Sequence, residues 1–166
     1  MENMIVERAA PQDAEEVYAL YHSLIDTPYS TWSEDYPSRE IVDDDVLNGK
    51  TIVMRDPSGR IAAAIALLPA EEEPEFDEIA PWYPDIKKWA IPSRLGVVAA
   101  QQGKGLAKRM LMAAMDYARA DGCDAVRFLV AKRNPIPQRA YAPLGFDICG
   151  ACEMWGEHWL CYQKRL

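Results

Sequence analysis

Apolar positions recur along the chain with the two periods that distinguish helices from strands. Residues 4–8 alternate as a short strand, and residues 11–25 repeat apolar side chains every three or four positions, as one face of a helix does. That face carries Val17, Leu20, Tyr21 and Leu24. Ser38 has the side chain of a helix cap, so a second helix is expected to about residue 47. The first part of the chain therefore predicts strand, helix, helix.

A pair of strands across a tight turn is expected next. Residues 51–55 and 60–68 are mostly apolar, and Asp56-Pro57-Ser58-Gly59 between them consists of turn-forming residues. Residues 69–84 then change to an acidic, proline-rich composition that does not suit a core element. We expect an antiparallel hairpin followed by a surface loop with a little local structure.

The second half of the chain alternates strands with helices. Residues 89–98 predict a strand, and residues 105–120 predict a helix that ends at Asp121-Gly122. Its apolar stripe contains Leu106, Met110, Ala113, Ala114 and Tyr117. Residues 125–130 predict the next strand. A helix that crosses between two neighbouring strands indicates a mixed α/β fold.

The C-terminal residues predict one helix and two strands. A short helix is expected after the run Asn134-Pro135-Ile136-Pro137, to about residue 144. Residues 146–154 and 158–164 predict strands that turn at Trp155-Gly156.

The length of 166 residues suits one domain, and 49% of the positions are apolar. The N-terminus has no cationic region followed by an apolar run, and eighteen successive apolar residues occur nowhere. We therefore expect a single domain over residues 1–166 that is soluble, cytoplasmic and without a membrane partner.

Charge is divided unevenly along the chain. Residues 1–100 carry 20 acids and 8 bases, whereas residues 101–141 carry 8 bases and three acids. The basic segment indicates an anionic ligand, although a solvated helix face has the same composition. A nucleic acid fits poorly, because a chain with a pI near 4.8 and an acidic N-terminal part repels a phosphate backbone. A small phosphate-bearing ligand fits better.

The four cysteines are too few for a disulfide scaffold of this length: Cys123, Cys149, Cys152 and Cys161. Three of them, with His158, have the donor atoms that zinc prefers. Residues three apart on a strand face opposite sides, however, and Cys149 and Cys152 stand on a predicted strand. We therefore expect reduced, packed thiols and no metal site.

A glycine-containing segment joins the strand at 89–98 to the helix at 105–120. It reads Gln101-Gln102-Gly103-Lys104-Gly105-Leu106-Ala107. A strand that enters a helix through glycines exposes backbone N–H groups at the positive end of the helix dipole, where phosphate binds. A plain structural turn is the alternative. The segment is not a P-loop, and it is not a dinucleotide fingerprint, because Lys108 stands at the third glycine.

This segment resembles the cofactor loop of the GNAT superfamily of acetyltransferases, which reads Gln or Arg, two residues, Gly, one residue, then Gly or Ala. Here these positions are Gln102, Gly105 and Ala107. A second family landmark follows at a matching distance, as Asn134, Tyr141 and then Leu144-Gly145-Phe146. The resemblance is strong over residues 88–166, and before them only the order of elements agrees.

The resemblance implies a mixed, mostly antiparallel central sheet with flanking helices, splayed between the strand before the loop and the strand after the helix. It implies acetyl-CoA as cosubstrate and no metal. The implied cofactor contacts are the side chain of Asn134, the main chain of Val97 and Val98, and the loop amides of Gln102, Gly103, Lys104, Gly105, Leu106 and Ala107. The candidates for the CoA phosphates are Lys104, Lys108 and Arg139.

The implied activity is an acetyl-CoA-dependent N-acyltransferase that acetylates a primary amine, of a small molecule or peptide, by direct attack in a ternary complex. Tyr141 matches the family's general acid, and a phenol with a pKa of about 10 can protonate a leaving thiolate. Alternatively, its ring is only a wall of the site. Residues 87–98 contain no carboxylate, so the general base is left among Glu78 or its neighbours in the acidic loop, His158, and a water chain to backbone carbonyls.

Other readings of the same residues stay open. One is a non-catalytic acyl-CoA-binding regulatory or sensor domain of the same fold, and another is an ATP- or NAD-binding α/β protein. Asn134 and Tyr141 favour the enzyme, whose partners would be acetyl-CoA and an amine, without nucleic acid; a homodimer is left open. The acidic residues 71–78, with Trp82 and Tyr83 after them, give the hypothesis of a cationic acceptor, set against an ordinary solvated loop.

Overall fold

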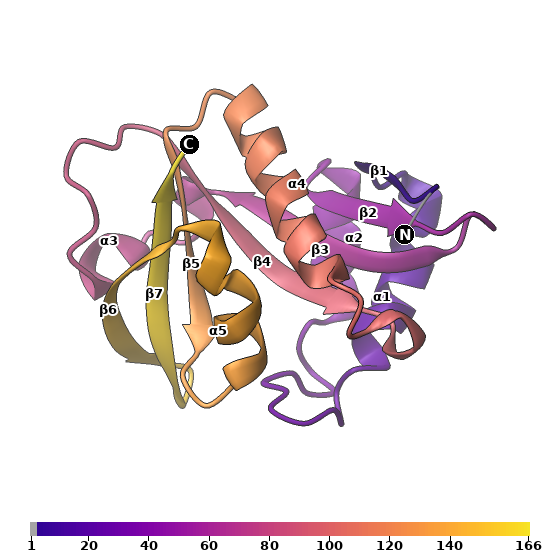
Figure 1. The fold of residues 1–166 in the computed structure, drawn as a ribbon. Coiled ribbons are helices and arrows are strands. Elements are labelled where there is room, and N and C mark those ends of the chain that lie inside the picture. The colour runs from indigo at the N-terminus through magenta and orange to yellow at the C-terminus, as the bar shows by residue number, and fades with distance from the viewer. Residues whose placement is uncertain (1–2) are drawn as a thin grey trace. The chain divides into compact units, whose positions relative to one another are not determined.

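The computed structural model describes residues 3–166, and their strands form a seven-stranded sheet in the order β1-β2-β3-β4-β5-β7-β6 (Figure 1). The strands are β1 (Ile5–Arg8), β2 (Thr51–Arg55), β3 (Ile61–Pro69), β4 (Trp89–Val97), β5 (Ala125–Ala131), β6 (Asp147–Met154) and β7 (Glu157–Arg165). The helices are α1 (Ala14–His22), α2 (Arg39–Leu47), α3 (Phe76–Ile79), α4 (Leu106–Ala120) and α5 (Pro135–Tyr141). The fold is the mixed α/β fold that the sequence predicted.

Strand pairing is mostly antiparallel, and the pair β4–β5 is parallel. β2 pairs with β1 and β3, and β7 pairs with β5 and β6, all antiparallel. β4 and β5 are parallel and pair at only two positions, Trp89 with Ala125 and Ala90 with Val126. β5 and β7, in contrast, pair along all of β5. So short a ladder is what a splayed pair of strands produces.

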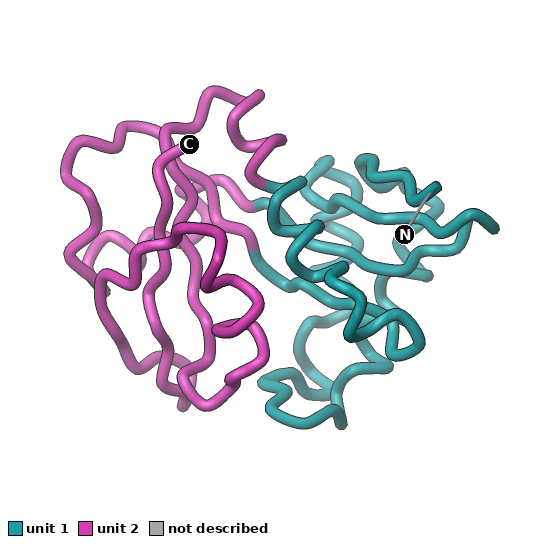
Figure 2. Tube along the Cα trace, viewed as in Figure 1, with its two compact units in different colours: residues 1–67, 93–114 teal, residues 68–92, 115–166 magenta. Residues whose placement is uncertain are grey.

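The chain divides into two compact units, coloured teal and magenta in Figure 2. Unit 1 contains residues 1–67 and 93–114, and unit 2 contains residues 68–92 and 115–166. β4 and α4 therefore have residues in both units. The expectation of a single domain over residues 1–166 stays a prediction.

The core of unit 1 lies between the helices α1 and α2 and the strands β2 and β3. Val17, Leu20, Tyr21 and Leu24 are buried in it, as predicted. The cap of α2 is also confirmed, because Ser38 Oγ accepts a hydrogen bond from the Ile41 N–H at 3.1 Å. α1 ends at His22, a little earlier than expected. The hydroxyls of Ser23 and Thr27 donate to carbonyls of the preceding turn there, which competes with continued helix.

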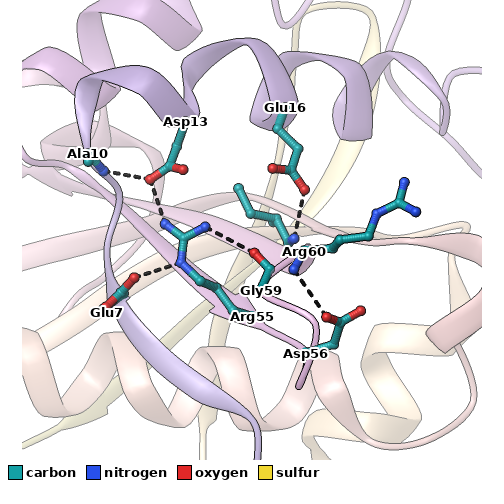
Figure 3. Close-up of polar contacts among 9 residues, drawn as sticks. Glu7, Ala10, Asp13, Glu16, Arg55, Asp56, Gly59 and Arg60 are labelled. Atoms are coloured by element: carbon teal, nitrogen blue, oxygen red, sulfur yellow. Dashed lines mark hydrogen bonds and ion pairs between the residues drawn. The ribbon is translucent and has the colours of Figure 1, made fainter.

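A network around Arg55 joins the start of the chain to the β2–β3 hairpin (Figure 3). Arg55 donates from Nε to Glu7 Oε2 at 2.6 Å and from Nη2 to Asp13 Oδ2 at 2.7 Å. Asp13 Oδ2 also accepts from the Ala10 N–H at 2.7 Å, and Glu16 accepts from the first N–H of β3. Burial alone would raise the pKa of Asp13, but the hydrogen bonds from Arg55 and Ala10 hold that pKa below its ordinary value.

The sheet of unit 2 carries aromatic rings on one face and a buried polar pair on the other. The rings pack with centroid separations of 5.1 to 6.3 Å and belong to Phe128, Tyr141, Phe146 and Tyr162. On the opposite face, Arg127 and Gln163 stand directly across from each other on β5 and β7 and are both buried.

The acid-rich segment of residues 69–84 forms the predicted loop, which includes α3. It packs over the buried polar pair Arg127 and Gln163. The Tyr83 N–H donates to Gln163 Oε1 at 3.2 Å, and Arg127 Nη2 donates to the Tyr83 carbonyl at 2.9 Å. The rings of Trp82 and Trp89 lie 5.2 and 4.8 Å from the Arg127 guanidinium. The loop is therefore fastened to the sheet by a cation between two indoles and by backbone hydrogen bonds.

Two helices differ in detail from the prediction. The buried residues of α4 are Leu106, Met110, Leu111, Ala114, Met115 and Ala118, while Ala113 and Tyr117 are half-buried. The buried face of α4 is thus wider than the predicted apolar stripe, and it is rotated about the helix axis away from Ala113 and Tyr117. α5 begins at Pro135 instead of after Pro137, because proline in a first turn loses no helical hydrogen bond.

Among residues 3–166, no helix has the length and apolar character that crossing a bilayer requires.

We predict that Asp13→Asn lowers the free energy of unfolding by about 2 kcal/mol at neutral pH, because it removes a charge-assisted bond at a side chain that is 9% exposed. Since the folded-state pKa of Asp13 is lowered, its contribution is complete above the unfolded-state pKa of about 3.9 and is lost as pH falls through the folded-state value. Urea unfolding from neutral to acidic pH measures this difference.

The control for this prediction is Asp43→Asn, which removes an exposed ion pair with Arg39. Exposed pairs contribute at most about 1 kcal/mol, so this variant should unfold nearly as the unmodified protein does. A stability loss in Asp13→Asn that does not shrink on acidification would contradict the assigned role of the Asp13 charge.

Candidate functional site

The segment between β4 and α4 holds both of its glycines in the left-handed backbone region. Gly103 and Gly105 have φ angles of +78° and +81°, in the left-handed region that favours glycine. Within the described part of the chain, no heavy atom beyond the adjacent residues lies within 4 Å of a Cβ built on either one. The first backbone bond into α4 runs from Arg109 N–H to the Gly105 carbonyl at 3.1 Å. The preceding N–H groups lie at the helix N-terminus, where anions are stabilised.

Cationic side chains accompany this segment. Lys104 is exposed and Lys108 is half-buried in the first turn of α4. Arg109, one of the eight bases of this segment but not among the expected phosphate contacts, has a buried Nη1 without a hydrogen-bond partner among the described residues. Its place beside Lys108 in the first turn was the available signal. Arg139, the other predicted phosphate contact, is exposed on α5 in unit 2.

The main-chain groups expected to pair with pantetheine already take part in hydrogen bonds of unit 1. Gln102 Nε2 donates to the Val97 carbonyl at 3.0 Å. The Val98 N–H donates to the Ala62 carbonyl at 2.9 Å, and the Val98 carbonyl accepts from the Gln101 N–H at 2.9 Å. A carbonyl oxygen has a second lone pair, so Val97 and Val98 can each accept one further bond.

β4 departs from regular strand geometry just before these residues, at Arg94, whose φ is +51°. A residue other than glycine rarely adopts this backbone conformation, so contacts of the Arg94 side chain must stabilise it. Arg94 donates from Nε and Nη2 to Asp45 Oδ2 at 3.0 and 2.8 Å, and from Nη1 to the Tyr36 hydroxyl at 3.1 Å. Burial alone would lower the pKa of Arg94, but Tyr36 and Asp45 raise it, so the guanidinium stays charged.

Helix α1 lies directly on the backbone of β4 at Gly96. A Cβ built on Gly96 would stand 2.8 Å from a methyl group of Leu20 and 3.1 Å from atoms of Leu24 and Tyr21. Burial raises the pKa of Tyr21, whose hydroxyl has no hydrogen-bond partner within the described residues. The end of β4 is therefore held by α1 on its backbone and by α2 through Asp45.

The second landmark of the sequence lies on α5 in unit 2. Asn134 caps this helix, since its Oδ1 accepts from the Ile136 N–H at 3.1 Å. Tyr141 is 6% exposed, and its ring packs edge-on against Phe128 with centroids 6.0 Å apart. Burial raises the pKa of Tyr141, and Tyr162 adds to the shift. The phenol is therefore protonated at neutral pH, as a proton donor must be.

The candidate bases and metal ligands are less well defined. Glu78 is exposed on α3, and the side chain of His158 is 69% exposed, with Nδ1 3.6 Å from Glu153 Oε2. Across residues 3–166, no group of three or more His, Cys, Asp or Glu side chains is arranged to hold a metal ion.

The aromatic faces suggested for a cationic acceptor are covered by arginines of the chain itself. Trp82 stacks on Phe76 with centroids 6.1 Å apart and meets the Arg127 guanidinium on β5. The Tyr83 ring lies 4.1 Å from the guanidinium of Arg165 on β7. The hypothesis that the Trp82 ring receives an ammonium group therefore does not hold in this structure, because the ring is buried against Phe76 and Arg127. The half-buried Tyr83 ring already contacts one cation, Arg165.

An open, mostly antiparallel sheet with a glycine loop leading into α4 is the arrangement that the GNAT-like landmarks of the sequence implied. A model of the acetyltransferase (GNAT) family matches residues 17–146. The chain belongs to this family. No curated protein matches it at a significant level.

Solved structures of this family share the fold across nearly the whole chain. A GNAT-family acetyltransferase from Streptococcus agalactiae has a TM-score of 0.80 and 24% identity, covering 99% of this chain and 96% of its own. The yncA protein from Salmonella typhimurium, solved with acetyl-CoA, has a TM-score of 0.75 and 18% identity, covering 99% and 95%. An agmatine N-acetyltransferase has a TM-score of 0.73 and 15% identity, covering 99% and 100%. At these identities the likeness concerns the fold.

We predict that Asp45→Asn destabilises the protein by about 3 to 5 kcal/mol, because it leaves the charge of Arg94 buried without a counter-ion. Asp44→Asn, one position earlier on the same helix, changes a side chain that is 62% exposed and should cost little. Chemical denaturation of both variants gives the comparison. Equal stability of the two variants would mean that the Arg94 charge is solvated by other groups.

Proposed function

We propose that the chain binds acetyl-CoA at residues 102–107 and transfers the acetyl group to a primary amine. The observation that carries this proposal is the glycine loop that enters α4, in a chain of the acetyltransferase (GNAT) family. Two left-handed glycines with open surroundings let the backbone amides approach a pyrophosphate closely. Lys104, Lys108, Arg109 and Arg139 are the cations proposed for the phosphates.

Acetyl-CoA would supply a thioester, from which an attacking amine expels the thiolate of CoA. The loop amides from Gln102 to Ala107 would orient the cofactor through its pyrophosphate. The carbonyls of Val97 and Val98 would accept hydrogen bonds from the pantetheine arm with their second lone pairs. The Asn134 amide nitrogen would donate to the same arm, because the Oδ1 of that side chain already caps α5.

Tyr141 is proposed as the general acid that protonates the departing sulfur. The assignment is supported by the position of Tyr141 seven residues after Asn134, as in the family landmark, and burial of the ring raises the pKa of the phenol, which is therefore protonated at neutral pH. Direct attack in a ternary complex also needs a base for the amine proton. Glu78, His158 and a water chain stay the candidates.

The acceptor is proposed to be a primary amine of a small molecule or a peptide. A structural neighbour of this chain is an agmatine N-acetyltransferase, and agmatine carries such an amine. The acidic residues 71–78 would favour a cationic acceptor through long-range attraction, which added salt would weaken. A cytoplasmic location belongs to the same proposal.

We predict that Gly105→Glu abolishes acetyl-CoA binding, because a carboxylate in the loop repels the pyrophosphate. The matched control is Gly59→Glu, since Gly59 has a similar φ of +87°, equally open surroundings and a place in the β2–β3 turn. Both variants bear the same backbone strain, but only the control should keep its affinity. Calorimetry with acetyl-CoA, and with ATP and NAD as comparison ligands, measures binding. Unchanged affinity in folded Gly105→Glu would refute the loop assignment.

We predict that Tyr141→Phe lowers kcat by about ten- to a thousandfold with little change in acetyl-CoA affinity. Tyr162→Phe is the control, because it removes a hydroxyl from the same aromatic cluster. Thiol release from acetyl-CoA across a panel of primary amines is the assay. Equal rates in the two variants would make Tyr141 a packing residue. Binding of acetyl-CoA without turnover of any amine would favour the non-catalytic sensor domain.

A further inference from the structure

Three cysteines gather on the β6–β7 hairpin of unit 2, and two of their sulfur atoms are neighbours. The Cys161 thiol donates to Cys152 Sγ, with the sulfurs 3.9 Å apart. Cys149 is directed differently, because its thiol donates to the Cys161 carbonyl at 3.4 Å and not to a sulfur. The cluster therefore contains one close pair of thiols, Cys152 and Cys161, and a third thiol that lies beside it.

The strand register explains why these two sulfurs meet. Cys152 stands opposite Trp159, and Cys161 follows two residues later on β7. Residues two apart on a strand share a face, so Cys152 and Cys161 are diagonal neighbours on the same side of the hairpin. The register shift between Ile148 and Gly150 lies on the same strand, next to this pair. Such bulges increase the local twist.

The two thiols differ in their access to solvent. Cys152 is half-buried, whereas Cys161 has no exposed surface. Burial, together with the neighbouring Cys152, raises the pKa of Cys161 to about 12, so Cys161 holds its proton at neutral pH. An oxidant that arrives from solvent thus meets Cys152 first, and Cys161 stands behind it as a second thiol.

We propose that Cys152 and Cys161 are a thiol modification site, which a low-molecular-weight disulfide such as oxidised glutathione converts into a reversible cross-link between β6 and β7. In the first step the Cys152 thiolate attacks one sulfur of the small disulfide, which forms a mixed disulfide and releases one thiolate. In the second step the Cys161 thiol gives its proton to the thiolate released in the first step, and the Cys161 thiolate so formed attacks Cys152 Sγ and expels the second glutathione thiolate. Two protein thiols are oxidised, and one disulfide is reduced to two thiols.

The cross-link requires a small movement of β6. Bonded sulfurs lie about 2.05 Å apart, and diagonal neighbours on paired strands are usually more widely spaced than bridged cysteines. β6 is the outermost strand in the sheet order and pairs only with β7 within the described residues, so it can move toward that strand. Disulfides formed against such resistance are readily reduced, and dithiols should therefore reverse this one.

Intact-mass measurement after incubation of the folded chain with oxidised glutathione tests the proposal. Cys123→Ser serves as the background, because it removes the one cysteine outside the hairpin. The expected product has lost the mass of two hydrogen atoms and carries no glutathione. Cleavage after Glu153 and Glu157 separates Cys161 from the other two cysteines, so a joined peptide pair identifies the cross-link. Dithiothreitol should restore two thiols that can be alkylated.

Two further substitutions in that background distinguish the partners. Cys149→Ser should still form the cross-link, whereas Cys152→Ser should not. A cross-link that persists in Cys152→Ser would assign the reaction to Cys149 and overturn the proposal. A stable glutathione adduct on Cys152 without loss of glutathione would overturn it equally, because it would show that Cys161 does not reach the mixed disulfide.

Discussion

A buried charge must have a partner, and in unit 1 this requirement determines how the chain leaves β4. The guanidinium of Arg94 meets Asp45 on α2 and Tyr36 in the segment before α2, so one side chain ties two parts of the chain to the strand. Two residues later, Gly96 lets α1 lie against the strand backbone. Val97, Val98 and the glycine loop follow immediately. The direction of the proposed cofactor loop thus rests on a short irregular stretch that an ion pair holds in place.

Local patterns in the sequence were sufficient for most of the architecture. The apolar stripe of α1, the Ser38 cap and the β2–β3 turn each depend on side chains close together in the chain, and each was confirmed. The loop at Gly103 and Gly105 was also identified from neighbouring residues, because glycine is the residue that readily tolerates the positive φ found there. Arg109 lay within reach of the same reasoning, as a cation in the first turn of a helix whose loop was already identified.

Features that depend on residues far apart in the chain were not predicted. Nothing near Arg94 in the sequence indicates that its partner is Asp45, and nothing near Trp82 indicates that Arg127 covers its ring. The sulfur pair on β6 and β7 was missed for a related reason. In the sequence, Cys149 and Cys152 stand close together on one strand, whereas the close contact joins Cys152 to Cys161 across the hairpin. The general base stays open because it depends on a substrate that the chain does not specify locally.

Tryptophan fluorescence reports mainly on unit 2, because the tryptophans are unevenly distributed between the two units. Four of the five, Trp82, Trp89, Trp155 and Trp159, belong to unit 2, and unit 1 contains Trp32 alone. Within unit 2 the environments also differ, because Trp82 and Trp89 are 9% exposed whereas Trp155 is 67% exposed. A shift of the emission spectrum during denaturation would report chiefly on the sheet that carries Arg127. Circular dichroism follows the helices of both units. Coincident transitions of the two signals would show that the units unfold together, and divergent transitions would show that they unfold separately.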